Sequence, residues 1–148
     1  MKRLESSLIS FILIIGILCT SCEKVEEAIV SNGVLSLSLW SDWKYEMQQG
    51  IDTIEGIFTN GCEEIGYSAG FFTSSDYTHS PDDVYYEEIT IDGVPCKIVA
   101  IRVQSDPDDR LFLFFKKGTN ATEHGHLNIT APDDLQKYID IFKTVRFL

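Results

Sequence analysis

Two apolar stretches within residues 94–117 form the strongest hydrophobic pattern of the chain, and the polar residues 105–109 separate them. Alternate residues of a strand share a face, so this pair carries apolar side chains on both of its faces. The first strand places Val99, Ile101 and Val103 on one face, and the second places Leu111, Leu113 and Phe115 on one face and Phe112 and Phe114 on the other. Such strands belong in the middle of a sheet, and we therefore expect a central hairpin inside one α+β domain.

Asn60-Gly61 predicts a second hairpin, because this dipeptide tolerates the two positive φ angles of a type I′ turn. A two-residue turn would pair Thr59 with Cys62 across the strands. The apolar side chains then collect on one face and the polar side chains on the other. The apolar set is Ile54, Phe58, Ile65, Tyr67 and Ala69. One side of this hairpin is therefore expected to face the core.

Asp92-Gly93 predicts a third hairpin with the same kind of turn. Its register pairs Ile89 with Cys96 and sets Glu88 opposite Lys97. Opposite charges placed directly across two strands stabilise the pairing, which supports this register.

Residues 34–40 alternate between leucine and mostly polar side chains, and residues 43–48 predict a further strand. Residues 126–130 predict a short strand, and an apolar stripe then predicts a helix that begins near Thr130. The stripe consists of Leu135, Tyr138, Ile139 and Phe142. The expected fold class is α+β: an antiparallel β-sheet built from successive hairpins and packed by a C-terminal helix.

Residues 1–21 have the parts of a bacterial signal peptide: a basic start at Lys2-Arg3, an apolar stretch and a small-residue end. The apolar run is about eleven residues long, whereas a membrane-spanning helix needs roughly 20. We therefore expect an export signal rather than a transmembrane anchor.

Thr20-Ser21-Cys22 resembles the lipobox of bacterial lipoproteins, although Cys19 stands where that motif has an aliphatic residue. The resemblance implies cleavage before Cys22 and attachment of palmitate-like acyl chains there, which would anchor the protein to a membrane. It places the protein in the cell envelope, at the outer membrane, on the periplasmic face or the cell surface. The alternative is ordinary secretion with Cys22 as a structural thiol. Residues 22–32 are expected to form an acidic tether, and residues 33–148 a single domain.

Five segments in order carry a second resemblance: Trp43, residues 50–56, residues 66–70, residues 91–93 and residues 141–145. Together they resemble uncharacterised bacterial envelope proteins with a PsbP-like fold. The resemblance implies an antiparallel sheet flanked by helices. It also implies a role in binding or assembly.

Composition and charge narrow the classes of partner. The 148 residues are 44% hydrophobic and 24% charged, which is ordinary for one globular domain. The net charge of −11 disfavours nucleic acid, because such a surface repels phosphate. It favours cationic partners, or serves only solubility.

The chain contains none of the common catalytic signatures, such as a Gly-x-Ser-x-Gly elbow, a P-loop or His-Glu-x-x-His. We expect no enzymatic activity and no cofactor. His124 and His126 would point the same way on a strand and, with His79 or Glu123, could hold a transition metal. The alternative is that these histidines are simply solvated.

Three further candidates concern ligands and cross-links. Asp52 and Glu55 lie between glycines and could form a binding loop, or serve only a tight bend. Pro-Asp-Asp, which occurs three times, could ligate calcium or serve local turns. Cys62 and Cys96 could form a disulfide after export or remain two unrelated thiols.

These observations predict a lipid-anchored cell-envelope protein that acts as a non-catalytic binding or assembly module. Its partners would be the membrane, through the lipid anchor, and an unknown envelope protein. The alternative is a metal- or small-ligand-binding module that uses His124 and His126.

Overall fold

The computed structural model describes residues 27–50, 53–70, 77–102, 109–118, 124–130 and 132–148. The strands are β1 (Glu27–Ser31), β2 (Leu35–Trp40), β3 (Lys44–Gln49), β4 (Thr53–Thr59), β5 (Glu64–Gly70), β6 (Asp83–Ile91), β7 (Val94–Arg102), β8 (Asp109–Lys116), β9 (His124–Thr130) and β10 (Arg146–Phe147). The helix is α2 (Leu135–Lys143).

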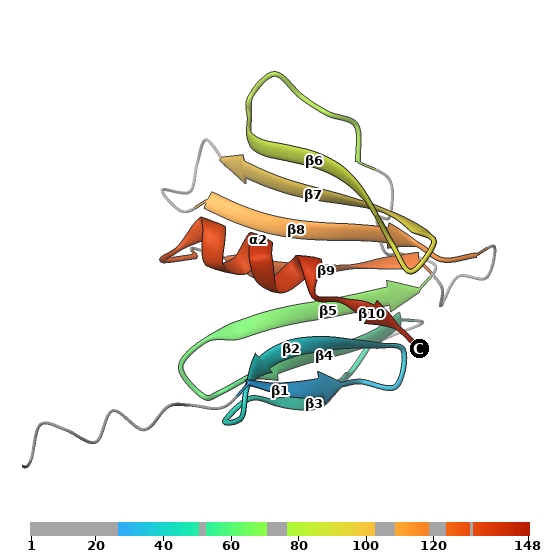
Figure 1. The fold of residues 1–148 in the computed structure, drawn as a ribbon, viewed down its shortest axis with the longest axis vertical. Helices are drawn as coiled ribbons and strands as arrows, with labels where there is room; N and C mark the ends of the chain where they lie inside the picture. Colours follow the sequence, from blue (N-terminus) through green and yellow to red (C-terminus); the bar gives the residue numbers. More distant parts are fainter. Residues whose placement is uncertain (1–26, 51–52, 71–76, 103–108, 119–123, 131) are drawn as a thin grey trace, which may run out of the picture.

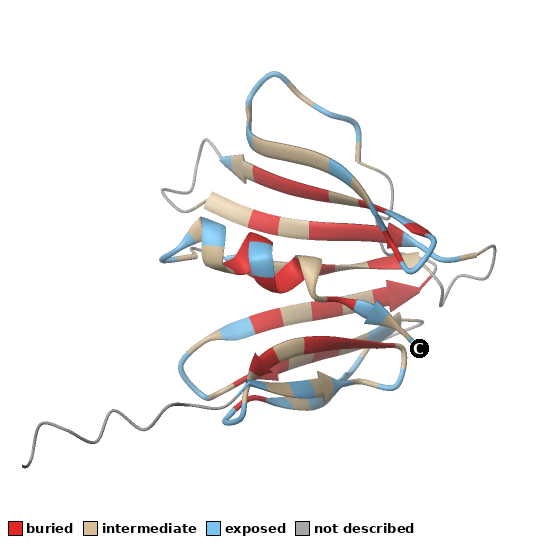
Figure 2. Ribbon diagram, in the orientation of Figure 1, coloured by how far each residue is buried: buried red, intermediate tan, exposed pale blue. Residues whose placement is uncertain are grey.

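The strands form two antiparallel sheets. The large sheet has seven strands in the order β3-β4-β5-β9-β8-β7-β6, and the small sheet has the order β1-β2-β10. Figure 1 shows α2 and the small sheet lying together against the large sheet. The core is the apolar layer between them, to which β2, α2 and the inner face of the large sheet contribute side chains (Figure 2).

The predicted fold class is wrong, because the domain is mostly β. Strands account for 65% of the described residues and the single short helix for 9%. Asp134, not a residue near Thr130, caps the helix, since its carboxylate accepts a hydrogen bond from the N–H of Lys137 at 3.1 Å. The layer packed against the large sheet consists of a three-stranded sheet with one short helix beside it, whereas the prediction had a helix alone.

The central hairpin is confirmed. β7 pairs with β8 from Cys96 opposite Phe115 to Arg102 opposite Asp109. Leu113 on the inner face and Val99 on the outer face are both 0% exposed, so both faces are covered. Val103 lies outside the described residues.

The Asp92-Gly93 hairpin is also confirmed, with Ile91 opposite Val94 and Glu88 opposite Lys97. Asp92 and Gly93 both have positive φ, 51° and 80°, as a type I′ turn requires.

The N-terminal region contains one strand that the sequence did not predict. Residues 27–31, expected to belong to the acidic tether, form β1 and pair with β2 from Glu27 opposite Trp40 to Ser31 opposite Ser36. Within the described residues, no helix is long and apolar enough to cross a membrane.

Candidate functional site

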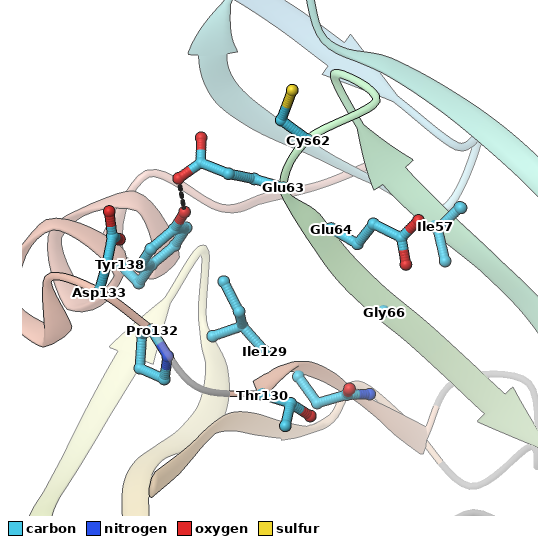
Figure 3. Close-up of a pocket in the computed structure, with 11 residues that line it drawn as sticks. Ile57, Cys62, Glu63, Glu64, Gly66, Ile129, Thr130, Pro132, Asp133 and Tyr138 are labelled. Carbon is cyan, nitrogen blue, oxygen red and sulfur yellow. Dashed lines mark hydrogen bonds between the residues drawn. The ribbon is translucent and has the colours of Figure 1, made fainter. Parts of the chain in front are cut away.

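The large sheet opens at one end, where β5 and β9 separate. These strands pair only from Gly66 opposite Asn128 to Ala69 opposite Gly125, and each continues for two residues beyond that pairing. A pocket of about 550 Å³ occupies the opening, and we call it the notch (Figure 3). Its lining residues are Ile57, Cys62, Glu63, Glu64, Gly66, Asn128, Ile129, Thr130, Pro132, Asp133 and Tyr138.

The loop from β4 to β5 forms one side of the notch, and its predicted register is wrong. Thr59 pairs with Glu64 and not with Cys62, so the loop has four residues rather than two. The buried hydroxyl of Thr59 accepts a hydrogen bond from the N–H of Gly61 and donates one to the carbonyl of Glu63, each at 2.9 Å. The longer loop stabilised by these bonds displaces the pairing by two residues. Four members of the predicted apolar face are buried, namely Phe58, Ile65, Tyr67 and Ala69, whereas Ile54 is exposed.

The side chain of Asn60 stabilises the same loop. Its Oδ1 accepts hydrogen bonds from the N–H groups of Cys62, at 3.0 Å, and Glu63, at 2.8 Å. Asparagine commonly bonds backbone groups two or three residues ahead in this way. The loop therefore satisfies its amides locally and directs Glu63 toward the helix.

Glu63 joins the loop to the first turn of α2. Its Oε1 accepts a hydrogen bond from Lys137 Nζ at 2.8 Å and another from the hydroxyl of Tyr138 (Figure 3). Burial opposes ionisation of Glu63, but the bonds from Lys137 and Tyr138 outweigh it and lower the pKa of this carboxyl. Burial, together with the Glu63 carboxylate, raises the pKa of Tyr138, so the phenol keeps its proton.

Lys137 extends this contact to the small sheet. Its Nζ lies 4.8 Å from the centroid of the Trp40 ring, a cation–π distance. Trp40 is the last residue of β2 and lies opposite Glu27, the first residue of β1. The edge of the notch, the helix and the start of β1 are therefore linked by consecutive contacts.

A close approach of two strands shapes the floor of the notch. A Cβ atom at Gly66 would lie 2.8 Å from Nδ2 and 2.9 Å from Oδ1 of Asn128. The amide of Asn128 thus occupies the space that a side chain at Gly66 would need. The floor consequently presents both an amide donor and an amide acceptor.

Two carboxylates of the notch have no cation partner among the described residues. Glu64 and Asp133 are both exposed, and neither takes part in an ion pair within that part of the chain. Glu63, by contrast, is paired with Lys137. Apolar side chains of Ile57 and Ile129 complete the lining. The notch can therefore receive a positively charged group that also carries an apolar portion.

A second polar cluster lies on the outer face of the large sheet. The carboxylate of Asp83 accepts hydrogen bonds from the Tyr77 hydroxyl, from His79 Nδ1 at 2.8 Å and from the Ser80 N–H at 2.8 Å. Burial opposes ionisation of Asp83, but these bonds lower its pKa. The Tyr77 ring stacks on Phe114 with centroids 5.6 Å apart. This cluster attaches residues 77–82 to the sheet.

The structure does not bring His124 and His126 into a metal site within the described residues. His124 Nε2 contacts the carbonyl of Gly118, and the His126 ring lies 5.8 Å from the ring centroids of both Phe112 and Phe114. No group of three or more His, Cys, Asp or Glu side chains in that part of the chain could hold a metal ion. Glu123 lies outside it.

Cys62 and Cys96 are both free. Cys62 is exposed in the β4–β5 loop, whereas Cys96 is buried on β7 opposite Phe115. Burial raises the pKa of the Cys96 thiol to about 12. The possible disulfide is therefore not formed in this structure.

Of the predicted binding loop, only Glu55 can be placed, because Asp52 lies outside the described residues. Glu55 belongs to β4 and accepts a hydrogen bond from the hydroxyl of Thr53 at 2.9 Å. Glu55 does not line the notch.

Sequence reasoning missed the notch because its residues come from separate segments. The signals were present locally: Glu63-Glu64 follows Asn60-Gly61, and Pro132 is followed by two aspartates. Only the separation of β5 from β9 brings them together.

No protein-family model, curated protein or solved structure matches the chain. The lipobox and PsbP-like resemblances therefore stay predictions. By its fold and site, the protein is a mostly-β, two-layer domain with an acidic notch at one end of its large sheet.

Proposed function

We propose that the protein is a lipid-anchored cell-envelope protein that binds an organic cation in the notch without transforming it. The observation that carries the proposal is a pocket of about 550 Å³ whose lining includes two carboxylates, Glu64 and Asp133, that lack a cation partner among the described residues. Small-ligand pockets commonly enclose about 300–1,000 Å³ and combine apolar walls with a few polar groups. The notch has this size and composition.

Charge supports a cation. The sequence carries a net charge of −11, and Glu64 and Asp133 add unneutralised negative charge at the pocket. A cation would gain Coulomb energy there, whereas an anion would be repelled.

Size and lining support an organic cation over a metal ion. A bare metal ion needs several ligands converging at about 2.0–2.6 Å, and no such group exists among the described residues. The apolar walls formed by Ile57, Ile129 and Pro132 would instead contact the carbon skeleton of an amine.

The chemistry of the lining supports binding without catalysis. Tyr138 has a raised pKa, and its hydroxyl already donates a hydrogen bond to Glu63, so it is poorly suited to acid–base exchange at neutral pH. Among the described residues of the notch, Cys62 forms no side-chain hydrogen bond to a base that would activate it as a nucleophile.

The lipid anchor rests on the sequence alone, since Cys22 lies outside the described residues. Radiolabelled palmitate should enter the protein in cells, and Cys22→Ala should remove both the label and the membrane attachment. A Cys22→Ala protein that stays membrane-bound would contradict the anchor.

The cation site is tested with a matched pair of probes, cadaverine and 1,5-pentanediol. They have the same chain length but only cadaverine is charged. Isothermal titration of the full mature chain in detergent should detect cadaverine and not the diol. The double variant Glu64→Gln/Asp133→Asn should bind about tenfold more weakly, which corresponds to about 1.4 kcal/mol from two exposed charges.

Glu88→Gln is the control variant, because it removes an exposed carboxylate on β6 outside the notch. It should bind cadaverine like the wild type. Equal binding of the diol, or unchanged binding by the double variant, would contradict the proposed site.

A further inference from the structure

We infer that the notch end of the domain faces the bilayer and that the notch binds the primary ammonium group of an ethanolamine phospholipid headgroup. This inference rests on the proposed function and names the class and source of the cation. It combines three observations: the place where β1 begins, the length of the sequence between Cys22 and β1, and the charge of the notch.

Strand β1 begins on the same side of the domain as the notch. Glu27 lies opposite Trp40, Lys137 Nζ lies 4.8 Å from the Trp40 ring, and Glu63 lies 2.8 Å from that Nζ. Figure 1 shows the start of β1, the β4–β5 connection and the start of α2 on the same side of the molecule. The attachment point of the N-terminal segment is therefore at the notch end.

The segment between the proposed anchor and β1 is short. Cys22 precedes Glu27 by five residues. Five residues span at most about 18 Å even when fully extended. A lipidated Cys22 would thus hold the start of β1 within about 18 Å of the bilayer surface.

The other edge of the large sheet lies farther away. β6 is three strands beyond β9 in the sheet order. Neighbouring strands lie about 4.8 Å apart, so the β6 edge is about 14 Å beyond the notch along the sheet. With so short a connection, the notch end is held nearer the headgroups than the β6 edge is.

Charge selects the kind of headgroup. Glu64 and Asp133 are exposed carboxylates that would repel anionic lipids at this distance. An ethanolamine headgroup carries a primary ammonium, whose N–H groups can donate hydrogen bonds to a carboxylate of the notch. The quaternary ammonium of choline has no N–H donor and makes a matched comparison.

Carbodiimide coupling tests this contact directly. The reagent activates a carboxylate, the headgroup amine then attacks the activated carbonyl, an amide forms, and the reagent leaves as a urea that retains one carboxylate oxygen. The full mature lipoprotein would be placed in vesicles of phosphatidylcholine with or without an equal share of phosphatidylethanolamine. Intact mass should show a lipid adduct only with phosphatidylethanolamine, mapped to Glu64 or Asp133.

Variants and a soluble probe separate the alternatives. Glu64→Gln/Asp133→Asn should lose most of the adduct, whereas Glu88→Gln should keep it. Free phosphoethanolamine added to phosphatidylcholine vesicles, at the same total amine concentration, should couple far less. Equal coupling of the free amine, or an adduct that survives in the double variant, would overturn the headgroup assignment.

Orientation can be measured separately by energy transfer to an acceptor-labelled lipid. Cys62 lies in the notch and is exposed, so its thiol can carry the donor dye. Transfer from Cys62 should be about twofold stronger than from Glu88→Cys in a Cys62→Ser background, because β6 lies three strands farther at about 4.8 Å each.

Stronger transfer from position 88 would overturn the orientation. If cadaverine still bound at the notch, that result would leave the proposed function standing. Loss of cadaverine binding together with the lipid adduct would remove both.

Discussion

Two hairpins of this domain begin from nearly the same sequence signal and end differently. Asp92-Gly93 forms a two-residue turn in which both residues have positive φ. At Asn60-Gly61 only the glycine has positive φ, 88°, and the loop has four residues. An X-Gly dipeptide therefore permits a tight turn but does not determine one.

The difference lies in the neighbouring side chains. Ile91 precedes the tight turn and has no polar group, so the backbone pairs directly with Val94. Thr59 precedes the wide loop, and its hydroxyl bonds two loop backbone groups that a tight turn would arrange differently. The tight turn closes its hairpin, whereas the wide loop carries Glu63 to the helix and borders the notch.

Thr59→Val should have the largest effect on this difference. It keeps the shape of the side chain but removes two hydrogen bonds, one from the N–H of Gly61 and one to the carbonyl of Glu63. Such losses cost about 2 kcal/mol in the free energy of unfolding, measurable by urea denaturation.

Thr90→Val is the matched control for Thr59→Val. It makes the same change in the strand before the tight turn, at an exposed position. Its unfolding free energy should stay within about 0.5 kcal/mol of the wild type. Equal effects of the two variants would mean that the hydroxyl of Thr59 does not stabilise the wide loop.

Asn60→Ala should have the next largest effect, about 1.5 kcal/mol, because it removes the acceptor for the amides of Cys62 and Glu63. Asn60→Asp keeps an oxygen at that position and should retain most of the stability. Thermal unfolding of the two variants decides the point. A loss in Asn60→Asp as large as in Asn60→Ala would contradict the role of Oδ1.

Gly61→Ala and Gly93→Ala should each cost about 1 kcal/mol, since both glycines have positive φ. No atom lies within 4 Å of a Cβ built at either position, so the cost comes from the backbone alone. Denaturant midpoints should therefore shift equally. Unequal shifts would show that the two loops differ in more than their side-chain bonds.

The sequence was most informative where one principle acted alone. The apolar pattern of residues 94–117 predicted a hairpin with both faces covered, because burial on two sides leaves no alternative position in a sheet. It was less informative where local hydrogen bonds competed with the turn preference, as at Asn60. It also could not show that β2 belongs to a different sheet from β3, since both patterns describe strands equally well.

The site was predicted least well, because the notch forms where two neighbouring strands, β5 and β9, are no longer hydrogen-bonded to each other. His124 and His126 were conspicuous by residue type. In the structure, however, His124 contacts the carbonyl of Gly118, and the His126 ring packs near the rings of Phe112 and Phe114. The notch arises where β5 and β9 stop pairing beyond Gly66 and Asn128. The pattern of apolar and polar residues along one strand does not indicate where its pairing with the neighbouring strand ends.

Glu63→Gln should have the smallest effect and should depend on pH. The pKa of Glu63 is lowered in the folded state, because the bonds from Lys137 and Tyr138 outweigh burial. Its contribution to stability is therefore present above the unfolded glutamate pKa of about 4.3 and is lost as the pH falls through the lower folded pKa. The side chain is 28% exposed, so the difference from wild type should stay below about 1 kcal/mol at pH 7.

Urea denaturation of wild type and Glu63→Gln should thus give unfolding free energies that differ at pH 7 and converge as the pH falls through the lowered folded pKa of Glu63. Adding Lys137→Met to both proteins should shrink the difference at pH 7, because the ion pair that lowers the pKa of Glu63 is then missing. Glu88→Gln is the control: its unfolding free energy should follow that of the wild type at every pH, which would assign the pH dependence to Glu63 in the wide loop. If the unfolding free energies of wild type and Glu63→Gln instead differed by a constant amount across this pH range, the effect of Glu63 would come from packing. The wide loop would then differ from the tight turn only through the hydrogen bonds of Thr59 and Asn60.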